Sequence, residues 1–194
     1  MAYPLEKKLV VAVSSRAVFD LEEANAVFEG EGVESYKRYQ SERIDVPLAK
    51  GVAFPFIRRL LRLNELYPDE LPVEVVVLSR NSPETGRRFF KSCATHGLNI
   101  TRGAFLSGQD THHYASAFNA SLFLSANRAD VMSATQAGFP AGLVMPSKLE
   151  DNETDHELRI AFDFDGVLAD DEAEKVYADG QIKAFQAHET IHSQ

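Results

Sequence analysis

The sequence has a single cysteine and no long apolar run. One cysteine cannot form an internal disulfide, and the helix-like apolar positions around Cys93 favour a core thiol over a catalytic one. The longest apolar runs, at residues 9–13 and 73–78, are far shorter than the roughly 20 residues of a membrane span. The N-terminus also lacks a signal-peptide pattern. We therefore expect no membrane partner and a cytoplasmic location.

Basic residues are in deficit, with 20 Lys and Arg against 29 Asp and Glu. Because no basic patch with interleaved aromatic residues occurs, nucleic acid is not an expected partner. Residues 1–150 hold 17 basic and 17 acidic residues, so the acidic excess lies in residues 151–194, which hold 3 and 12. A run of acidic residues is most often a solvated surface. Part of the run at residues 151–194 follows a strand pattern, however, and its carboxylate oxygens are suited to binding a cation.

Short apolar, β-branched runs alternate with helical patterns along the chain. This alternation predicts an α/β fold, a three-layer, doubly wound and mostly parallel sheet with helices on both faces. The predicted strands are residues 9–13, 73–78, 104–106, 122–124, 142–145 and 159–162.

Three helices are predicted between these strands. Residues 55–67 place apolar side chains on one face and arginines on the other, as in an amphipathic helix. Ser82 and Pro83 mark the start of a second helix, with Ser82 as the cap, and Gly97 marks its end. Asn127 and Gly138 mark the start and the end of a third helix.

The polar stretch 147–158 is rich in turn-forming residues and is predicted to be a linker. Before it, residues 5–146 contain enough strands and helices for a complete α/β unit. After it, a strand pattern returns. We therefore expect a second unit to begin at residues 159–194.

Two carboxylates follow the last predicted strand. Asp163 and Asp165 come directly after Ile160-Ala-Phe162 and before Gly166, and open α/β sheets bind ligands at the carboxyl ends of their strands. Residues two apart in an extended segment point the same way, so one carboxylate can attack phosphorus while the other transfers a proton. A Mg²⁺ ion held by both would offset their repulsion. The alternative is a hydrated turn.

The longer string around this pair resembles the first motif of the haloacid-dehalogenase superfamily. It consists of the apolar strand, Asp163-Phe-Asp-Gly-Val-Leu168, and then an acidic cluster at residues 170–172. On that resemblance the fold is haloacid-dehalogenase-like, or Rossmannoid. Asp163 is the nucleophile that becomes a phosphoaspartate, and Asp165 is the general acid and base.

The start of the chain partly repeats this motif. When residues 11–19 are placed beneath residues 160–168, Ser14 falls opposite Asp163 and Arg16 opposite Asp165. We infer a duplicated unit that lost its acids. Ser14, Ser15 and Arg16 are then candidates for binding a phosphate or ribose, although ordinary turn hydroxyls are an equal alternative.

The second strand also ends in polar residues. Ser79, Asn81 and the helix amides after Ser82 are arranged to cradle an anion. The alternative is that they only cap the helix. After the strand 122–124, Ser125 and Asn127 stand where the superfamily carries acidic metal ligands, so residues 5–146 are not expected to hold a complete active site.

Four segments together resemble the cytosolic type I 5'-nucleotidase family: Ala12–Asp20, Tyr67–Glu70, Leu122–Ala126 and Arg159–Glu174. The resemblance implies Mg²⁺-dependent hydrolysis of nucleoside 5'-monophosphates such as AMP or IMP, with Asp163 and Asp165 also holding the metal. The family continues beyond this motif with a further Ser/Thr strand end, a lysine and a paired-acid metal site. We therefore expect the 194 residues to be the first part of a longer enzyme.

Several alternatives stay open. The strand bearing Asp163 would use Ser79 for phosphate if it joined the sheet of the first unit, or that of a second copy in a homo-oligomer. The serine-containing unit would alternatively bind a nucleotide without chemistry, or the enzyme would act on other small phosphate esters. His112 and His113 are predicted to start a helix, with a metal site as the alternative.

Overall fold

The computed structural model describes residues 7–148 and 150–163. The chain forms two compact units, Met1–Glu157 and Leu158–Gln194. Of the second unit, residues 158–163 are described, and they have no regular secondary structure. The predicted strand at 159–162 is therefore wrong, because a strand needs a hydrogen-bonded neighbour and none of the described strands pairs with this segment.

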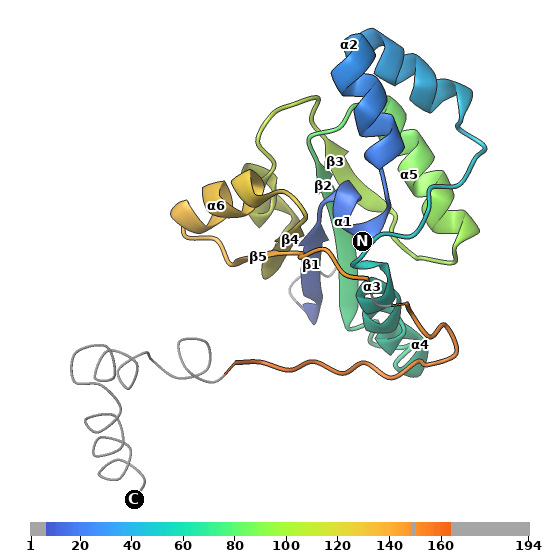
Figure 1. Ribbon diagram of the computed structural model, residues 1–194. Helices are drawn as coiled ribbons and strands as arrows, with labels where there is room; N and C mark the ends of the chain where they lie inside the picture. The colour runs from blue at the N-terminus through green and yellow to red at the C-terminus, as the bar shows by residue number, and fades with distance from the viewer. Residues whose placement is uncertain (1–6, 149, 164–194) are drawn as a thin grey trace, which may run out of the picture. The chain divides into compact units, whose positions relative to one another are not determined.

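Five parallel strands form the sheet of the first unit, in the order β3-β2-β1-β4-β5 (Figure 1). They are β1 (Leu9–Val13), β2 (Val73–Ser79), β3 (Arg102–Phe105), β4 (Leu122–Ser125) and β5 (Ala141–Leu143). The chain winds outward from β1 to β3 and then crosses back to β4. The direction of winding thus reverses beside β1, and all five carboxyl ends meet at one edge.

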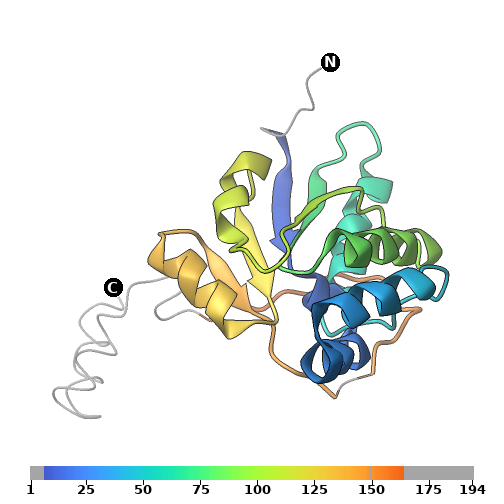
Figure 2. The same cartoon turned by 90° about the horizontal axis from the view of Figure 1, so that it is seen from above.

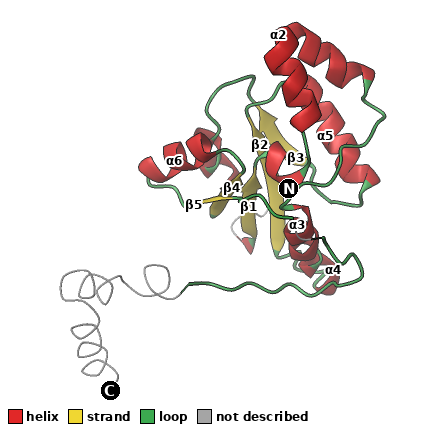
Figure 3. Ribbon diagram, in the orientation of Figure 1, coloured by secondary structure: helices red, strands yellow, loops and turns green. Residues whose placement is uncertain are grey.

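Helices cover both faces of the sheet (Figures 2 and 3). One side carries α3 (Phe54–Leu61), α4 (Leu63–Leu66), α5 (Pro83–Thr95) and α2 (Glu22–Glu42), and α2 packs against α5. The other side carries α6 (Arg128–Gln136) and two 3-10 helices, η2 (His112–Tyr114) and η3 (Ser116–Phe118). The short α1 (Ser15–Val18) follows β1 directly.

The core has one apolar layer on each face of the sheet, because successive strand residues point to opposite faces. Even-numbered residues of β1 and β2 pack with Phe123 and Ala134 on the side of α6. On the other side Phe19, Phe54 and Phe89 are almost fully buried, and the ring centroid of Phe19 lies 6.0 Å from Phe54 and 5.2 Å from Phe89. Burial of each such ring contributes about 1.5–3 kcal/mol.

The α/β class and the first five strands are confirmed, with shifts of a few residues at β3 and β5. The predicted helix 55–67 is two consecutive helices, α3 and α4. Helices α5 and α6 lie where their start and end residues predicted. Ser82 occupies the cap position of α5, but its side chain makes no capping bond to a helix amide. Its hydroxyl lies 3.5 Å from that of Thr85.

Helix α2 was not predicted. Its sequence contains Gly30 and Gly32, and the backbone at Gly32 leaves the helical region (φ 84°, ψ −177°). Glycine lowers helix propensity, and the kink divides the helix into two shorter pieces. The described helices include none that is both long and apolar enough to cross a membrane.

Candidate functional site

A cavity of about 470 Å³ opens at the carboxyl edge of the sheet. It lies where Ser14 follows β1, Ser79 ends β2 and Ser125 ends β4. The reversal of winding beside β1 falls at the same place, which is where open α/β sheets bind ligands. The five residues predicted to bind substrate all line it: Ser14, Ser15, Arg16, Ser79 and Asn81.

Backbone amides orient the serine side chains at the cavity floor. The amide of Asn81 donates to Ser79 Oγ over 3.1 Å, and that of Ala126 donates to Ser14 Oγ over 3.2 Å. Both serines are less than a tenth exposed. Each hydroxyl oxygen thus accepts a hydrogen bond from a backbone amide, and its own proton can be donated to another group.

Ser15 and Ser79 link the ends of β1 and β2. Their Oγ atoms lie 2.8 Å apart, and Asn81 Nδ2 donates to Ser15 Oγ over 3.0 Å. The hydroxyl of Ser79 therefore takes part in two hydrogen bonds, one with the hydroxyl of Ser15 and one that it accepts from the amide of Asn81. Ser15, Ser79 and Asn81, which were predicted at two separate strand ends, thus form one hydrogen-bonded cluster.

Ser125 belongs to a separate, charged group. Its Oγ accepts from the amide of Asn127 over 3.1 Å and donates to Asp130 Oδ2 over 3.2 Å. The other oxygen of Asp130 accepts from Arg80, whose guanidinium also binds Asp110. Asp130, which lines the cavity and is 5 % exposed, is thus held on both oxygens.

The wall of the cavity comes from α2. Leu21, just before the helix, and Phe28, Val33 and Tyr36 line it, and the rings of Phe28 and Tyr36 meet edge to face at 5.9 Å. Burial raises the pKa of Tyr36, although a hydrogen bond with Thr85 opposes that shift. Its hydroxyl lies 2.7 Å from Thr85 Oγ1. This wall could not be expected from the sequence, because α2 was not predicted.

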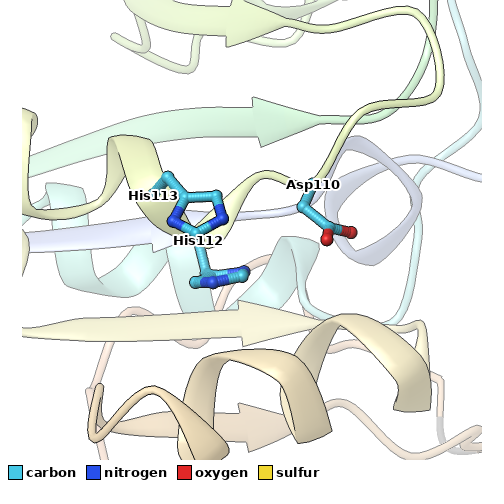
Figure 4. Close-up of side chains that lie close together, drawn as sticks. All are labelled: Asp110, His112 and His113. Carbon is cyan, nitrogen blue, oxygen red and sulfur yellow. The ribbon is translucent and has the colours of Figure 1, made fainter.

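Asp110, His112 and His113 also lie close together (Figure 4). One ligand atom from each lies within 4.8 Å of the others, and the two imidazole centroids are 3.9 Å apart. His112 does start η2, as predicted. Two imidazoles suit zinc or a similar ion better than Mg²⁺, which prefers oxygen ligands. Asp110 is moreover already bound to Arg80, so the cluster does not supply the predicted Mg²⁺ site.

Of the predicted carboxylate pair, Asp163 is described and exposed, whereas Asp165 lies outside the described residues. Carboxylate oxygens are the hard donors that Mg²⁺ prefers, so the chemistry of the pair fits that ion. The roles of both residues stay predictions.

The sequence profile of the 5'-nucleotidase family matches residues 1–194. This chain belongs to the 5'-nucleotidase family. It is 31% identical over 188 residues to cytosolic 5'-nucleotidase 1B of Homo sapiens, an alignment that covers 94% of this chain and 31% of that protein. The chain thus spans less than a third of the length of that relative. The predicted family is confirmed.

Proposed function

We propose that this 5'-nucleotidase family member hydrolyses nucleoside 5'-monophosphates of the AMP or IMP type, with Asp163 as nucleophile. The supporting observation is that the family match continues through the motif Asp163-Phe-Asp-Gly-Val-Leu168. The fold of the first unit is consistent with a haloacid-dehalogenase-like enzyme, since its sheet is parallel and flanked by helices. The human relative is named cytosolic, and we propose a cytoplasmic location here too.

The proposed reaction has two steps. A carboxylate oxygen of Asp163 attacks phosphorus, the bond from phosphorus to the ribose 5'-oxygen breaks, and Asp165 gives its proton to that leaving oxygen. Asp165 then takes a proton from water, which attacks the phosphoaspartate and releases phosphate. Mg²⁺, when bound by these carboxylates, would neutralise part of the phosphate charge.

Asp163→Asn tests this proposal. Measured as phosphate release from AMP and IMP by the complete gene product, the variant should lose at least about a thousandfold in kcat, because an amide cannot form the phosphoaspartate. Asp69→Asn, which changes an equally exposed acid, is the matched control and should keep full activity. Normal turnover by Asp163→Asn would show the assignment to be wrong.

Hydrolysis of other small phosphate esters would use the same carboxylates. A substrate panel of AMP, IMP and ribose 5-phosphate separates the two proposals, because a nucleotidase should prefer the first two by kcat/KM. We also propose a first unit at residues 5–146, a linker at 147–158 and the start of a second unit at 159–194. Limited proteolysis of the gene product tests these boundaries. Measurement of its mass in solution tests whether it forms a homo-oligomer.

A further inference from the structure

We infer that the cavity at the carboxyl edge of β1, β2 and β4 is a nucleotide-binding site in its own right, which holds a phosphate monoester bearing a planar base and does no chemistry on it. This inference goes beyond the proposed hydrolysis, because it needs neither Asp163 nor Asp165. The described residues that line the cavity all lie between Ser14 and Asp130. Its volume, about 470 Å³, lies within the range of small-molecule sites.

The floor offers hydroxyl protons to a ligand. Ser15 and Ser79 share one hydrogen bond, which uses one of their two protons, and the other proton has no acceptor among the described residues. Ser14 Oγ only accepts, from the amide of Ala126. Two hydroxyl protons on residues that line the cavity are therefore available to a ligand. Oxygen atoms that only accept hydrogen bonds, as in a phosphate, satisfy both.

The surrounding charge also favours an anion. Arg16 and Lys37 line the cavity, and each is paired with a glutamate outside it, Glu22 at 2.9 Å and Glu34 at 3.0 Å. Both glutamate side chains are more than three-quarters exposed. Because exposed ion pairs are weak, a phosphate can replace these partners at little cost. The cap residues of α5 and α6, Ser82 and Asn127, also line the cavity, and the N-terminal ends of these helices add positive potential.

The apolar side chains of α2 suit a flat aromatic group. Phe28 and Val33 line the cavity yet are 46 % and 50 % exposed, so both present apolar surface that a ligand would cover. The ring of Phe28 makes an edge-to-face contact with Tyr36, which also lines the cavity. The cavity therefore combines hydroxyls and cations with an apolar, aromatic wall, which together match the phosphate and the base of a nucleotide.

Among the described residues, the cavity has no activated nucleophile for phosphate transfer. Among its lining residues Asp130 is the one carboxylate, and Ser125 and Arg80 occupy both of its oxygens. No histidine lines the cavity either, so the described residues provide no general base to activate Ser14, Ser15 or Ser79. A bound nucleotide should therefore be released unchanged.

The test is isothermal titration calorimetry of the 194-residue chain carrying Asp163→Asn and Asp165→Asn, which prevents turnover. AMP should bind with a stoichiometry of one. Adenosine, which lacks the phosphate, and ribose 5-phosphate, which lacks the base, should each bind at least about tenfold more weakly, a loss equal to one or two good contacts. The unsubstituted chain with EDTA should bind AMP with the same Kd.

Two variants locate the ligand in the double-substituted chain. Ser79→Ala removes a floor hydroxyl and Arg16→Gln removes a half-exposed cation, and each should raise the Kd for AMP about tenfold. Ser133→Ala and Arg87→Gln, which lie outside the cavity lining, are the matched controls and should leave the Kd unchanged. Circular dichroism confirms that each variant is folded, and Arg16→Gln serves where Ser79→Ala does not fold.

Three results would overturn the inference. They are equal affinity for AMP and adenosine, an unchanged Kd in folded Ser79→Ala and Arg16→Gln, and loss of AMP binding on substitution of Asp163 and Asp165. The phosphate-release assay with Asp163→Asn alone tests the proposed hydrolysis separately. Failure of one proposal is therefore distinguishable from failure of the other.

Discussion

At the scale of single residues, the exchange of a carboxylate for a hydroxyl separates two kinds of chemistry. Ser14 occupies the end of β1, the position at which the repeated motif carries Asp163. A carboxylate there attacks phosphorus and repels an anion unless a cation is present, whereas a hydroxyl held by a backbone amide donates its proton to one. On the inference above, the first unit would bind a phosphate at the strand ends without a nucleophile to attack it.

Cys93 provides a prediction at this scale. Burial raises the pKa of its thiol to about 12, and the side chain is 1 % exposed. Ellman's reagent should therefore leave the native chain unmodified at about pH 8 and label one thiol after unfolding in guanidinium chloride, since the thiolate is the reactive form. Ala94→Cys, at the next, exposed position of α5, is the control and should add one thiol that labels at once.

The same pKa sets a pH dependence. Because the folded pKa lies above the ordinary value of about 8.5, the contribution of Cys93 to stability is fully present below that pH and is lost as the pH rises toward 12. Cys93→Ala should flatten this alkaline part of the stability profile, as measured by urea unfolding. A native thiol that labels rapidly at about pH 8 would contradict the burial described here.

At the scale of elements, the kink in α2 shapes the cavity wall. Phe28 precedes Gly32 and Val33 follows it, and both side chains line the cavity. The backbone angles at Gly32 lie in a region that essentially only glycine occupies. Gly30, in contrast, has no such angle and no atom within 4 Å of an added Cβ.

The two glycines should therefore respond in opposite directions to alanine. Gly32→Ala should destabilise the chain by about 1–3 kcal/mol because of backbone strain. Gly30→Ala should stabilise it by about 0.5–1 kcal/mol because alanine is the better helix former. Urea unfolding followed by circular dichroism measures both. Equal effects of the two substitutions would mean that the kink is absent in solution.

At the scale of the whole molecule, the stretch predicted as a linker is attached to the first unit along part of its length. Arg58 and Arg59, on α3, bind the two oxygens of Asp151 over 3.1 and 2.7 Å. Arg58 also donates to the carbonyl oxygens of Glu153 and Asp155. The arginines predicted to form the polar face of residues 55–67 thus hold a segment about ninety residues further along the chain.

Asp151→Ala should release this segment. The substitution leaves two guanidiniums, whose side chains are 22 % and 14 % exposed, without their carboxylate, and should lower the free energy of unfolding by about 1–3 kcal/mol. Trypsin cleavage after the exposed Lys148 should become faster. Unchanged cleavage and stability would show that the contact contributes nothing.

Glu153→Gln is the matched control, because this acid lies two residues further along and is fully exposed. A hydrogen bond from Lys50 lowers the pKa of Glu153, so the pair contributes above the ordinary pKa of a glutamate and loses that contribution as the pH falls through the lowered value. Screening by solvent keeps this contribution small, so unfolding near neutral pH should hardly change.

The sequence by itself determined the α/β class, five of the strands, the family and the group of serines at the strand ends. Apolar runs and helix-terminal residues are local patterns, and parallel strands necessarily bring their carboxyl ends to one edge. Only the tertiary structure decided that α2 supplies the cavity wall, that Asp130 is held by Arg80 and Ser125, and that residues 159–162 lack a partner strand in the described part. Each of these depends on contacts between residues distant in sequence, which no local pattern encodes.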